Sequence, residues 1–209
     1  MIDLTHLIEE NMPVFPGTEG PSLENTNTIE ADGFAEKELT FFSHTGTHMD
    51  APAHMLINGK TLDAYSISDF FGAAVLVDLT SPGLDYVGVE TLRPVEALLQ
   101  KSKFLVLKTG WSRFWGQPEY FENFPALTPE AAEWAVETGI KGVGIDAISI
   151  DRITDYQFPV HHVLFRAGLF VIENLAGLER LSTSFQMGCF PLKIRQADGA
   201  PARVVAWEI

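Results

Sequence analysis

The stretch LTPEAAEWAVETGIKGVGIDA, residues 127–147, decides the fold class because it sets a helix directly before a buried strand. Thr128 can cap the helix, Pro129 suits its first turn, and Gly139 can end it. Residues 141–147 then form a short apolar run, which is typical of a strand covered on both faces. A helix that leads into such a strand is the repeating unit of α/β proteins.

The same alternation continues on both sides of this unit. Helices are predicted at residues 88–101, where Pro94 must interrupt the spacing, and at residues 159–168. Strands are predicted at residues 2–8, 36–43, 72–80, 103–110, 169–175, 184–194 and 202–209, and a loop rich in Pro and Gly at residues 12–22. We therefore expect an α/β fold, a layered domain with a mixed sheet, and one such domain over residues 1–209.

The composition is that of a globular protein, and it argues against two classes of partner. Of the 209 residues, 46% are hydrophobic and 20% are charged. The formal net charge of −14 argues against nucleic acid and anionic membranes as partners. No apolar run approaches the roughly 20 residues of a membrane span, and residues 1–13 lack the pattern of a signal peptide, so we expect a cytoplasmic location. The single cysteine, Cys189, is expected to be a buried small hydrophobic residue.

The stretch HTGTHMDAPAH, residues 44–54, holds three of the six histidines in the chain together with an aspartate. Gly46 and Pro52 argue against a continuous helix, and the predicted strand at residues 36–43 would lead into an extended segment. In such a segment alternate residues tend toward one side, here His44, His48, Asp50 and His54. Imidazole and carboxylate ligands suit zinc, iron, manganese or nickel. The segment therefore predicts a metal site.

The members of this cluster need not all bind metal. A catalytic metal site usually has three protein ligands and an open position for water, and Asp50 has two oxygens with which to bridge two ions. His54 lies furthest along the segment and is the candidate general base. Two other interpretations stay open at this point: the facial triad of a non-haem iron oxygenase, and a metal-stabilised module without catalysis.

A second group of polar residues lies in HHVLFRAGLFVIEN, residues 161–174. Glu173 ends an apolar strand, where an unpaired carboxylate is costly to bury. Taken alone it would be a surface or capping residue, and together with the first cluster a metal ligand is the better interpretation. Because His161 and His162 are adjacent, at most one of them is expected to face the first cluster. His6 is expected to be structural.

The chain resembles the cyclase family of metal-dependent hydrolases, which includes bacterial kynurenine formamidase and isatin hydrolase. Residues 44–54 match the family motif H-x-G-T-H-x-D-x-P-x-H at every fixed position. Other stretches follow in the family's order: DLTH, MPVFPG, LKTGW, GVGIDAISID, HHVLFRAGLFVIENL and FPLKIRQADGAPARVVA. The resemblance therefore covers nearly the whole chain.

This resemblance implies a fold, a metal centre and an assembly. The fold would be of the swivelling β/β/α kind, commonly a homodimer. One metal would be bound by His44, His48 and Asp50, and a second by Asp50, His161 and Glu173, with His54 as the catalytic base. The metal would be Zn²⁺, with Mn²⁺ as the alternative, in one or two ions per chain.

The resemblance also implies hydrolysis of a small-molecule amide by a metal-bound hydroxide. It favours an arylformamidase that converts N-formyl-L-kynurenine to L-kynurenine and formate, a step of tryptophan breakdown. A cyclic amide such as isatin, or a lactone, is the alternative substrate for the same metal site. Four aromatic residues near the motifs are candidates for the wall that holds an aryl ring: Phe15, Phe42, Trp111 and Trp115.

Overall fold

The fold is a mixed sheet that closes on itself. The computed structural model describes residues 1–81 and 83–208. Its main sheet has eight strands in the order β1 (Ile2–Asp3), β12 (Gly199–Trp207), β11 (Ser184–Pro191), β5 (Phe71–Asp78), β7 (Phe104–Lys108), β9 (Gly142–Ile145), β10 (Phe170–Glu173) and β4 (His48–Asp50). A further pairing of β4 with β12 closes seven of them into a barrel, with β1 outside.

Strands β5, β7, β9 and β10 run parallel, whereas β11, β12 and β4 pair antiparallel with their neighbours. The predicted α/β fold with a mixed sheet is thus confirmed, and the closure of the sheet into a barrel is an addition to it. The predicted strands 72–80, 103–110, 141–147, 169–175 and 184–194 are all present in shorter form. The predicted strand 202–209 is β12, which begins three residues earlier; Ile209 lies outside the described residues.

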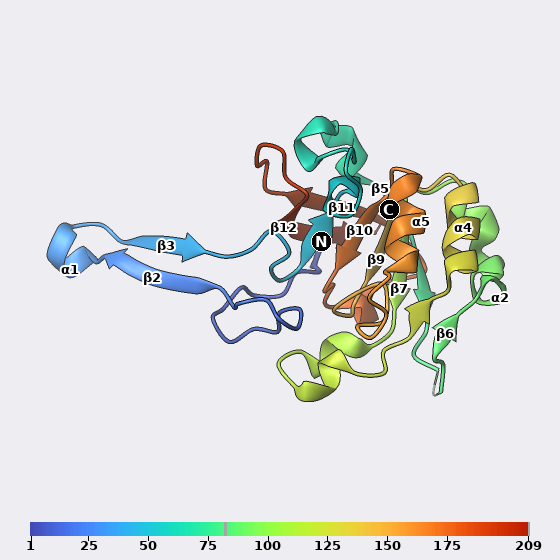
Figure 1. Cartoon of the computed structure of the whole chain (residues 1–209), viewed down its shortest axis with the longest axis horizontal. Coiled ribbons are helices and arrows are strands. Elements are labelled where there is room, and N and C mark those ends of the chain that lie inside the picture. Colours follow the sequence, from blue (N-terminus) through green and yellow to red (C-terminus); the bar gives the residue numbers. More distant parts are fainter. Residues whose placement is uncertain (82, 209) are drawn as a thin grey trace.

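The helices lie against one side of the barrel (Figure 1). They are α2 (Val89–Leu92), α3 (Glu96–Leu99), α4 (Pro129–Glu137) and α5 (Pro159–Arg166). The Thr128 hydroxyl accepts a hydrogen bond from the amide of Ala131, so α4 begins as predicted. A 3₁₀ turn at Arg93–Val95 separates α2 from α3, because Pro94 interrupts the predicted helix 88–101.

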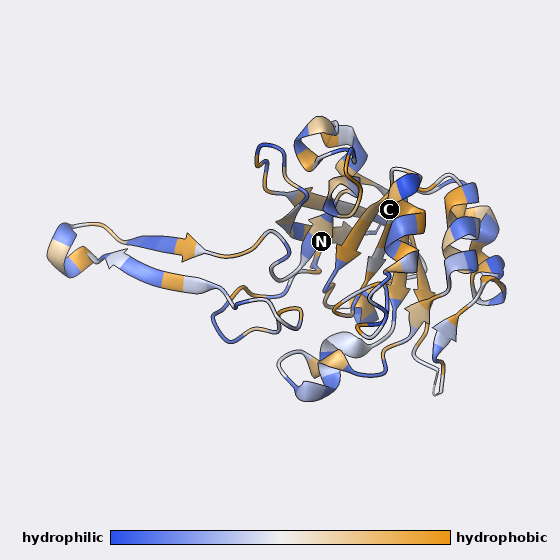
Figure 2. Ribbon diagram, viewed as in Figure 1, coloured by the Kyte–Doolittle hydropathy of each residue, from blue (hydrophilic) through white to orange (hydrophobic). Residues whose placement is uncertain are grey.

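The strands are apolar on both faces, and each face has its own core (Figure 2). Along β7, Leu105 and Leu107 pack with the helices, whereas Phe104 and Val106 pack into the other buried cluster. Cys189 belongs to this second cluster and is fully buried, as expected. Burial on both faces explains why these strands read as continuous apolar runs instead of alternating ones.

A hairpin arm, residues 22–40, projects away from the body (Figure 1). It consists of β2 (Ser22–Asn27), α1 (Ile29–Asp32) and β3 (Glu36–Thr40), and within the described part of the chain its two strands pair only with each other. The predicted strand 36–43 is present as β3, but the prediction that it leads directly into the histidine cluster is wrong, because β3 belongs to the arm. Likewise, the predicted strand 2–8 is reduced to β1.

The remaining elements are short. Strands β6 (Tyr86–Val87) and β8 (Ala126–Leu127) pair in parallel beside the helices. The 3₁₀ helices are η1 (Pro52–His54), η2 (Leu62–Ala64), η3 (Ile67–Phe70), η4 (Arg93–Val95), η5 (Trp111–Phe114), η6 (Pro118–Phe121) and η7 (Leu178–Arg180). Within the described residues, every helix is too short or too polar to cross a bilayer.

Candidate metal centre

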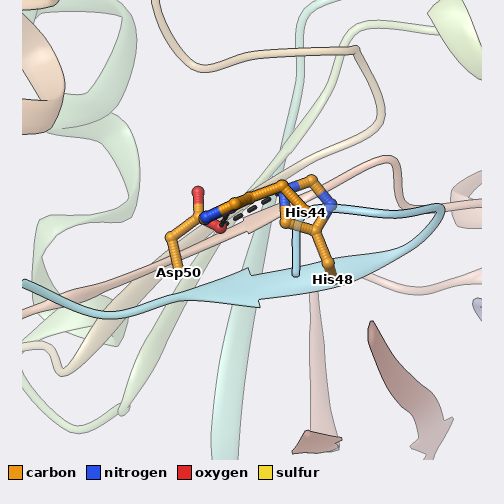
Figure 3. A group of neighbouring side chains, drawn as sticks. All are labelled: His44, His48 and Asp50. Atoms are coloured by element: carbon orange, nitrogen blue, oxygen red, sulfur yellow. Dashed lines mark hydrogen bonds and ion pairs between the residues drawn. The ribbon is translucent and has the colours of Figure 1, made fainter. Parts of the chain in front are cut away.

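The centre is built around β4, the short strand that closes the barrel. Its partner on one side is β10, with His48 directly opposite Glu173, and on the other side β12, with Asp50 opposite Gly199. Because side chains alternate along a strand, Met49 enters the core and its two neighbours face the other way. Figure 3 shows the side chains of His44, His48 and Asp50 converging on this face.

A turn at Gly46 brings His44 back over the strand. Gly46 has a φ of +64°, a left-handed conformation that favours glycine. Its carbonyl oxygen accepts hydrogen bonds from His48 Nδ1 and Asn174 Nδ2, both at 2.8 Å. The expected extended conformation therefore holds only for β4, since the chain bends at Gly46 and turns into η1 at Pro52.

Hydrogen bonds also fix which nitrogen of each buried imidazole faces the centre. His48 Nδ1 donates to Gly46, which leaves Nε2 at 3.2 Å from Asp50 Oδ1. His161 Nδ1 donates to Asp151 Oδ2 at 2.7 Å, which leaves Nε2 at 3.3 Å from Glu173 Oε1. An outer hydrogen bond of this kind sets the tautomer and orientation of a metal-binding histidine.

Asp151 has a second role at the start of α5. Its carboxylate accepts the amides of Val160 and His161, both at 3.0 Å, so it caps the helix that carries His161. Glu173 is held in turn by the amide of Ile150, which donates to Oε1 at 2.9 Å. The two ligand candidates from distant segments are thus held in different ways, His161 by the carboxylate of Asp151 and Glu173 by the amide of Ile150.

The solvent-facing side of the centre contains His44, His54 and Asp198. His44 Nδ1 lies 2.6 Å from Asp50 Oδ1, and its Nε2 lies 2.8 Å from Asp198 Oδ2. His54 lies beside it, with ring centroids 3.9 Å apart, and His54 Nδ1 is 3.6 Å from the same oxygen of Asp198. Asp198 was not predicted, although it stands in the stretch FPLKIRQADGAPARVVA, which resembles the family.

The charges of the centre demand a cation. Burial lowers the pKa of His48, but the carboxylates of Asp50 and Glu173 outweigh it and raise that pKa to about 10. Burial likewise lowers the pKa of His44, but Asp50 and Asp198 raise it to about 9. In the opposite sense, burial raises the pKa of Glu173, but the neighbouring imidazoles lower it to about 2. Without a metal, protons on the imidazoles supply the positive charge; a metal ion displaces them when it binds.

The donor set fits a divalent metal ion. His44, His48 and Asp50 each offer a ligand atom within 4.8 Å of the others, and so do Asp50, His161 and Glu173. Asp50 Oδ2 is buried and has no hydrogen-bond partner among the described residues, although a buried carboxylate oxygen normally has one. These two groups contain the residues of the two predicted ligand sets, with Asp50 common to both, and a third group joins His44, His54 and Asp198.

A cavity of about 250 Å³ opens beside these residues. His54 and Phe15 line it, together with an apolar wall of Met55, Ile148 and Phe158. Phe158 was not predicted; its φ of +46° is uncommon for a bulky residue and places its ring against Phe15, with centroids 6.4 Å apart.

The other predicted aromatic residues do not line this cavity among the described residues. Phe42 is exposed, and Trp111 packs against Phe114. Trp115 stacks on His6, with ring centroids 3.8 Å apart, which agrees with a structural role for His6. His162 belongs to neither metal-ligand group.

Comparison with known proteins agrees with this geometry. The sequence profile described as "Putative cyclase" matches residues 2–152. The chain belongs to the cyclase family. The kynurenine formamidase of Geobacillus thermodenitrificans (strain NG80-2) is 29% identical over 204 residues, which cover 97% of this chain and 94% of that protein.

Two solved structures extend the comparison to three dimensions. Isatin hydrolase A from Labrenzia aggregata, bound to benzyl benzoate, superposes with a TM-score of 0.87 at 26% identity, covering 98% of this chain and 92% of that one. A structure described as a potential metal-dependent hydrolase with cyclase activity has a TM-score of 0.80 at 32% identity, with coverage of 98% and 96%. Both similarities extend over nearly the whole chain. The similarity to the potential metal-dependent hydrolase, together with the histidine and carboxylate groups of the centre, supports a divalent metal ion here.

Proposed function

We propose that this protein is a metal-dependent amide hydrolase of the arylformamidase type, which converts N-formyl-L-kynurenine to L-kynurenine and formate. The observation that carries the proposal is one carboxylate, Asp50, that belongs to two possible ligand groups, with His54 beside them in the wall of a cavity. The full-length relatives named kynurenine formamidase support the substrate. The shared carboxylate and His54 favour hydrolysis over the oxygenase and non-catalytic alternatives.

Each residue has a definite task in this reaction. His44, His48 and Asp50 would hold one ion, and Asp50, His161 and Glu173 a second, with Zn²⁺ the preferred metal and Mn²⁺ the alternative. A bound ion of this kind activates water as a nucleophile and stabilises the negative charge that develops on the carbonyl oxygen. The resident residues fix the donor atoms, exclude bulk water from the buried side, and keep the imidazoles turned inward.

His54 is placed to handle the proton. Burial lowers the pKa of His54, so its imidazole is neutral near pH 7 and able to accept a proton. With Nδ1 facing Asp198, Nε2 is the nitrogen free to take a proton from water and deliver it to the leaving nitrogen. Phe15 and Phe158 would hold the aryl ring of the substrate in the cavity.

The alternative substrate is a cyclic amide such as isatin, or a lactone. The similarity of fold to isatin hydrolase structures favours it, and the apolar wall of the cavity suits a flat ring. Ring opening and deformylation make the same demand on the centre, because each begins with attack of water on a carbonyl carbon.

The test is turnover of the two substrates side by side. Metal-free protein is reconstituted with zinc or manganese, and formate release from N-formyl-L-kynurenine is followed beside ring opening of isatin. Deformylation that requires the metal and exceeds isatin opening supports the proposal. If the metal-loaded protein hydrolyses neither substrate, the arylformamidase assignment is wrong. If it opens isatin faster than it deformylates N-formyl-L-kynurenine, the cyclic amide is the better substrate assignment.

We also propose that the protein acts as a homodimer in the cytoplasm. The hairpin arm supports a dimer: all five residues of β3 are exposed, and Leu39 is 56% exposed. A two-stranded hairpin is marginally stable alone, so a second copy of the chain would cover this arm. Light scattering should give twice the chain mass, and Leu39→Asp should shift it toward the monomer. A monomer at all concentrations would contradict this.

A further inference from the structure

Asp198 reaches the metal centre through the closure of the barrel. It stands immediately before β12, whose first residue, Gly199, pairs with Asp50 of β4. The amide of Ala51 donates to the Asp198 carbonyl at 2.8 Å, so the backbone of this residue is held directly beside the ligand strand. A carboxylate 154 residues away from His44 in sequence is thereby placed against its ring.

One oxygen of Asp198 meets three side chains. Asp198 Oδ2 lies 2.8 Å from His44 Nε2 and 3.6 Å from His54 Nδ1. The hydroxyl of Ser43 donates to the same oxygen at 3.3 Å. This carboxylate therefore contacts both a candidate metal ligand and the candidate base.

The neighbouring glycine completes the cradle for His44. A Cβ at position 199 would lie 2.5 Å from His44 Cε1, closer than real contacts of this kind. The Cε1 edge of the imidazole therefore packs closely against β12 at Gly199, with Asp198 at its Nε2 end. This leaves Nδ1 directed at Asp50 Oδ1, 2.6 Å away, toward the shared carboxylate of the centre.

We propose that Asp198 is a positioning residue of this centre. By accepting from His44 Nε2 it orients that ring so that Nδ1 faces the metal site, and it holds His54 in place for proton transfer. The inference rests on the proposed metal-dependent hydrolysis and deepens it. The arrangement matches that of His161, whose Nδ1 donates to Asp151 while Nε2 faces the centre. Each of these two imidazoles has one nitrogen on an outer carboxylate and the other turned inward.

The test compares Asp198→Asn and Asp198→Ala with Asp63→Asn as the matched control. Asp63 accepts from the Thr61 hydroxyl at 2.7 Å, and the amide of its neighbour Leu62 donates to the Ala197 carbonyl, so it lies beside the same loop without facing a histidine. Zinc affinity is measured by competition with a chelator, and kcat and KM are measured separately with N-formyl-L-kynurenine.

We expect Asp198→Ala to weaken zinc binding about 10- to 100-fold, the usual effect of losing an outer-shell partner. Asp198→Asn should lose less, because its amide oxygen still accepts from His44 Nε2. In both variants kcat should fall while KM stays within about twofold, since the residue orients His54 instead of binding substrate. Asp63→Asn should match the unaltered protein.

Several results would overturn the inference. Unchanged zinc affinity and kcat in Asp198→Ala would remove the positioning role, and a loss carried by KM alone would make Asp198 a substrate contact. With cobalt in place of zinc, the visible spectrum reports the coordination number of the metal. A different coordination number in Asp198→Asn than in the unaltered protein would make Asp198 a metal ligand. The affinity and cobalt measurements need no substrate, so they decide the inference even if no amide is hydrolysed.

Discussion

The metal centre has two sides that differ in exposure. On the rim, side-chain exposure runs from 23 to 44% for His44, His54 and Asp198. On the floor it runs only from 1 to 7% for His48, Asp50, His161 and Glu173. The floor is held by backbone groups and by the buried carboxylate of Asp151, whereas the rim is held by Asp198, a carboxylate that solvent reaches.

This difference indicates a division of tasks. Burying a set of charged groups is costly unless every member is paired, so the floor is suited to bind a cation that balances its carboxylates. Residues of both sides line the cavity, but those of the rim are also reached by solvent and can exchange protons with water, as a hydrolytic reaction requires. Changes on the floor should therefore abolish metal binding and destabilise the fold, while changes on the rim should alter turnover.

The largest effect is expected from Asp50→Ala. Removing the shared carboxylate should leave less than half an equivalent of zinc per chain, measured by atomic emission after dialysis. In the metal-free state the buried imidazoles of His48 and His161 lose one of their two neighbouring carboxylates and keep Glu173, so the free energy of unfolding should fall by about 3 kcal/mol. Urea unfolding of the metal-free variant measures this. Two equivalents of zinc in Asp50→Ala would refute the bridging role and the comparison with it.

His54→Ala should separate the rim from the floor most cleanly. We expect kcat to fall about 10²- to 10⁴-fold, the usual contribution of general acid–base catalysis, while zinc content stays unchanged. His162→Ala is the matched control, since this neighbouring histidine belongs to neither ligand group. If the zinc is lost instead, His54 is a ligand; if full activity remains, it is not the base.

The features of the centre and the fold that could be predicted from the sequence are those formed within one continuous stretch of chain. Residues 44–54 carry four of the seven residues of the rim and the floor in a single motif, and Thr128 and Pro129 begin α4 where predicted. Closure of the barrel could not be predicted, because the pairing of β4 with β12 joins segments about 150 residues apart and has no local signature. Asp198 was missed for the same reason.

The arm shows the same limit from the other direction. The alternating pattern of residues 36–43 correctly indicates β structure, since β3 covers part of it. Alternation identifies a strand but does not identify its partner, and here the partner is β2 in a separate hairpin. The conformation of Gly46 is also a local property, but the bonds from His48 and Asn174 that hold it come from two different strands or their ends.

Gly199→Ala tests how tightly the rim is packed. The added methyl group would lie 2.5 Å from His44 Cε1, so the imidazole must move, and we expect zinc affinity to fall about tenfold. Gly88→Ala is the matched control, because a Cβ there meets nothing within 4 Å. Equal zinc affinity in the two variants would show that the His44 ring is free to shift, and would weaken the case for a fixed rim.

The smallest effect is expected from pH, and its sign follows from the pKa shifts. The pKa of His44 is raised to about 9 and that of His48 to about 10, from 6.5, so their stabilisation is complete below pH 6.5 and is lost as pH rises toward 10. Glu173, lowered to about 2 from 4.5, contributes above pH 4.5 and loses its contribution as pH falls toward 2.

Metal-free protein should therefore resist urea best between about pH 4.5 and 6.5, as far as these groups decide it, and less at pH 9. Zinc reverses the sign, because the ion displaces the same protons and binds more tightly as pH rises. Urea midpoints at pH 6 and pH 9, with and without zinc, measure both trends. If the metal-free protein instead gains stability from pH 6 to pH 9, the buried imidazoles do not hold protons in place of a metal ion. The contrast between floor and rim would then have no electrostatic basis.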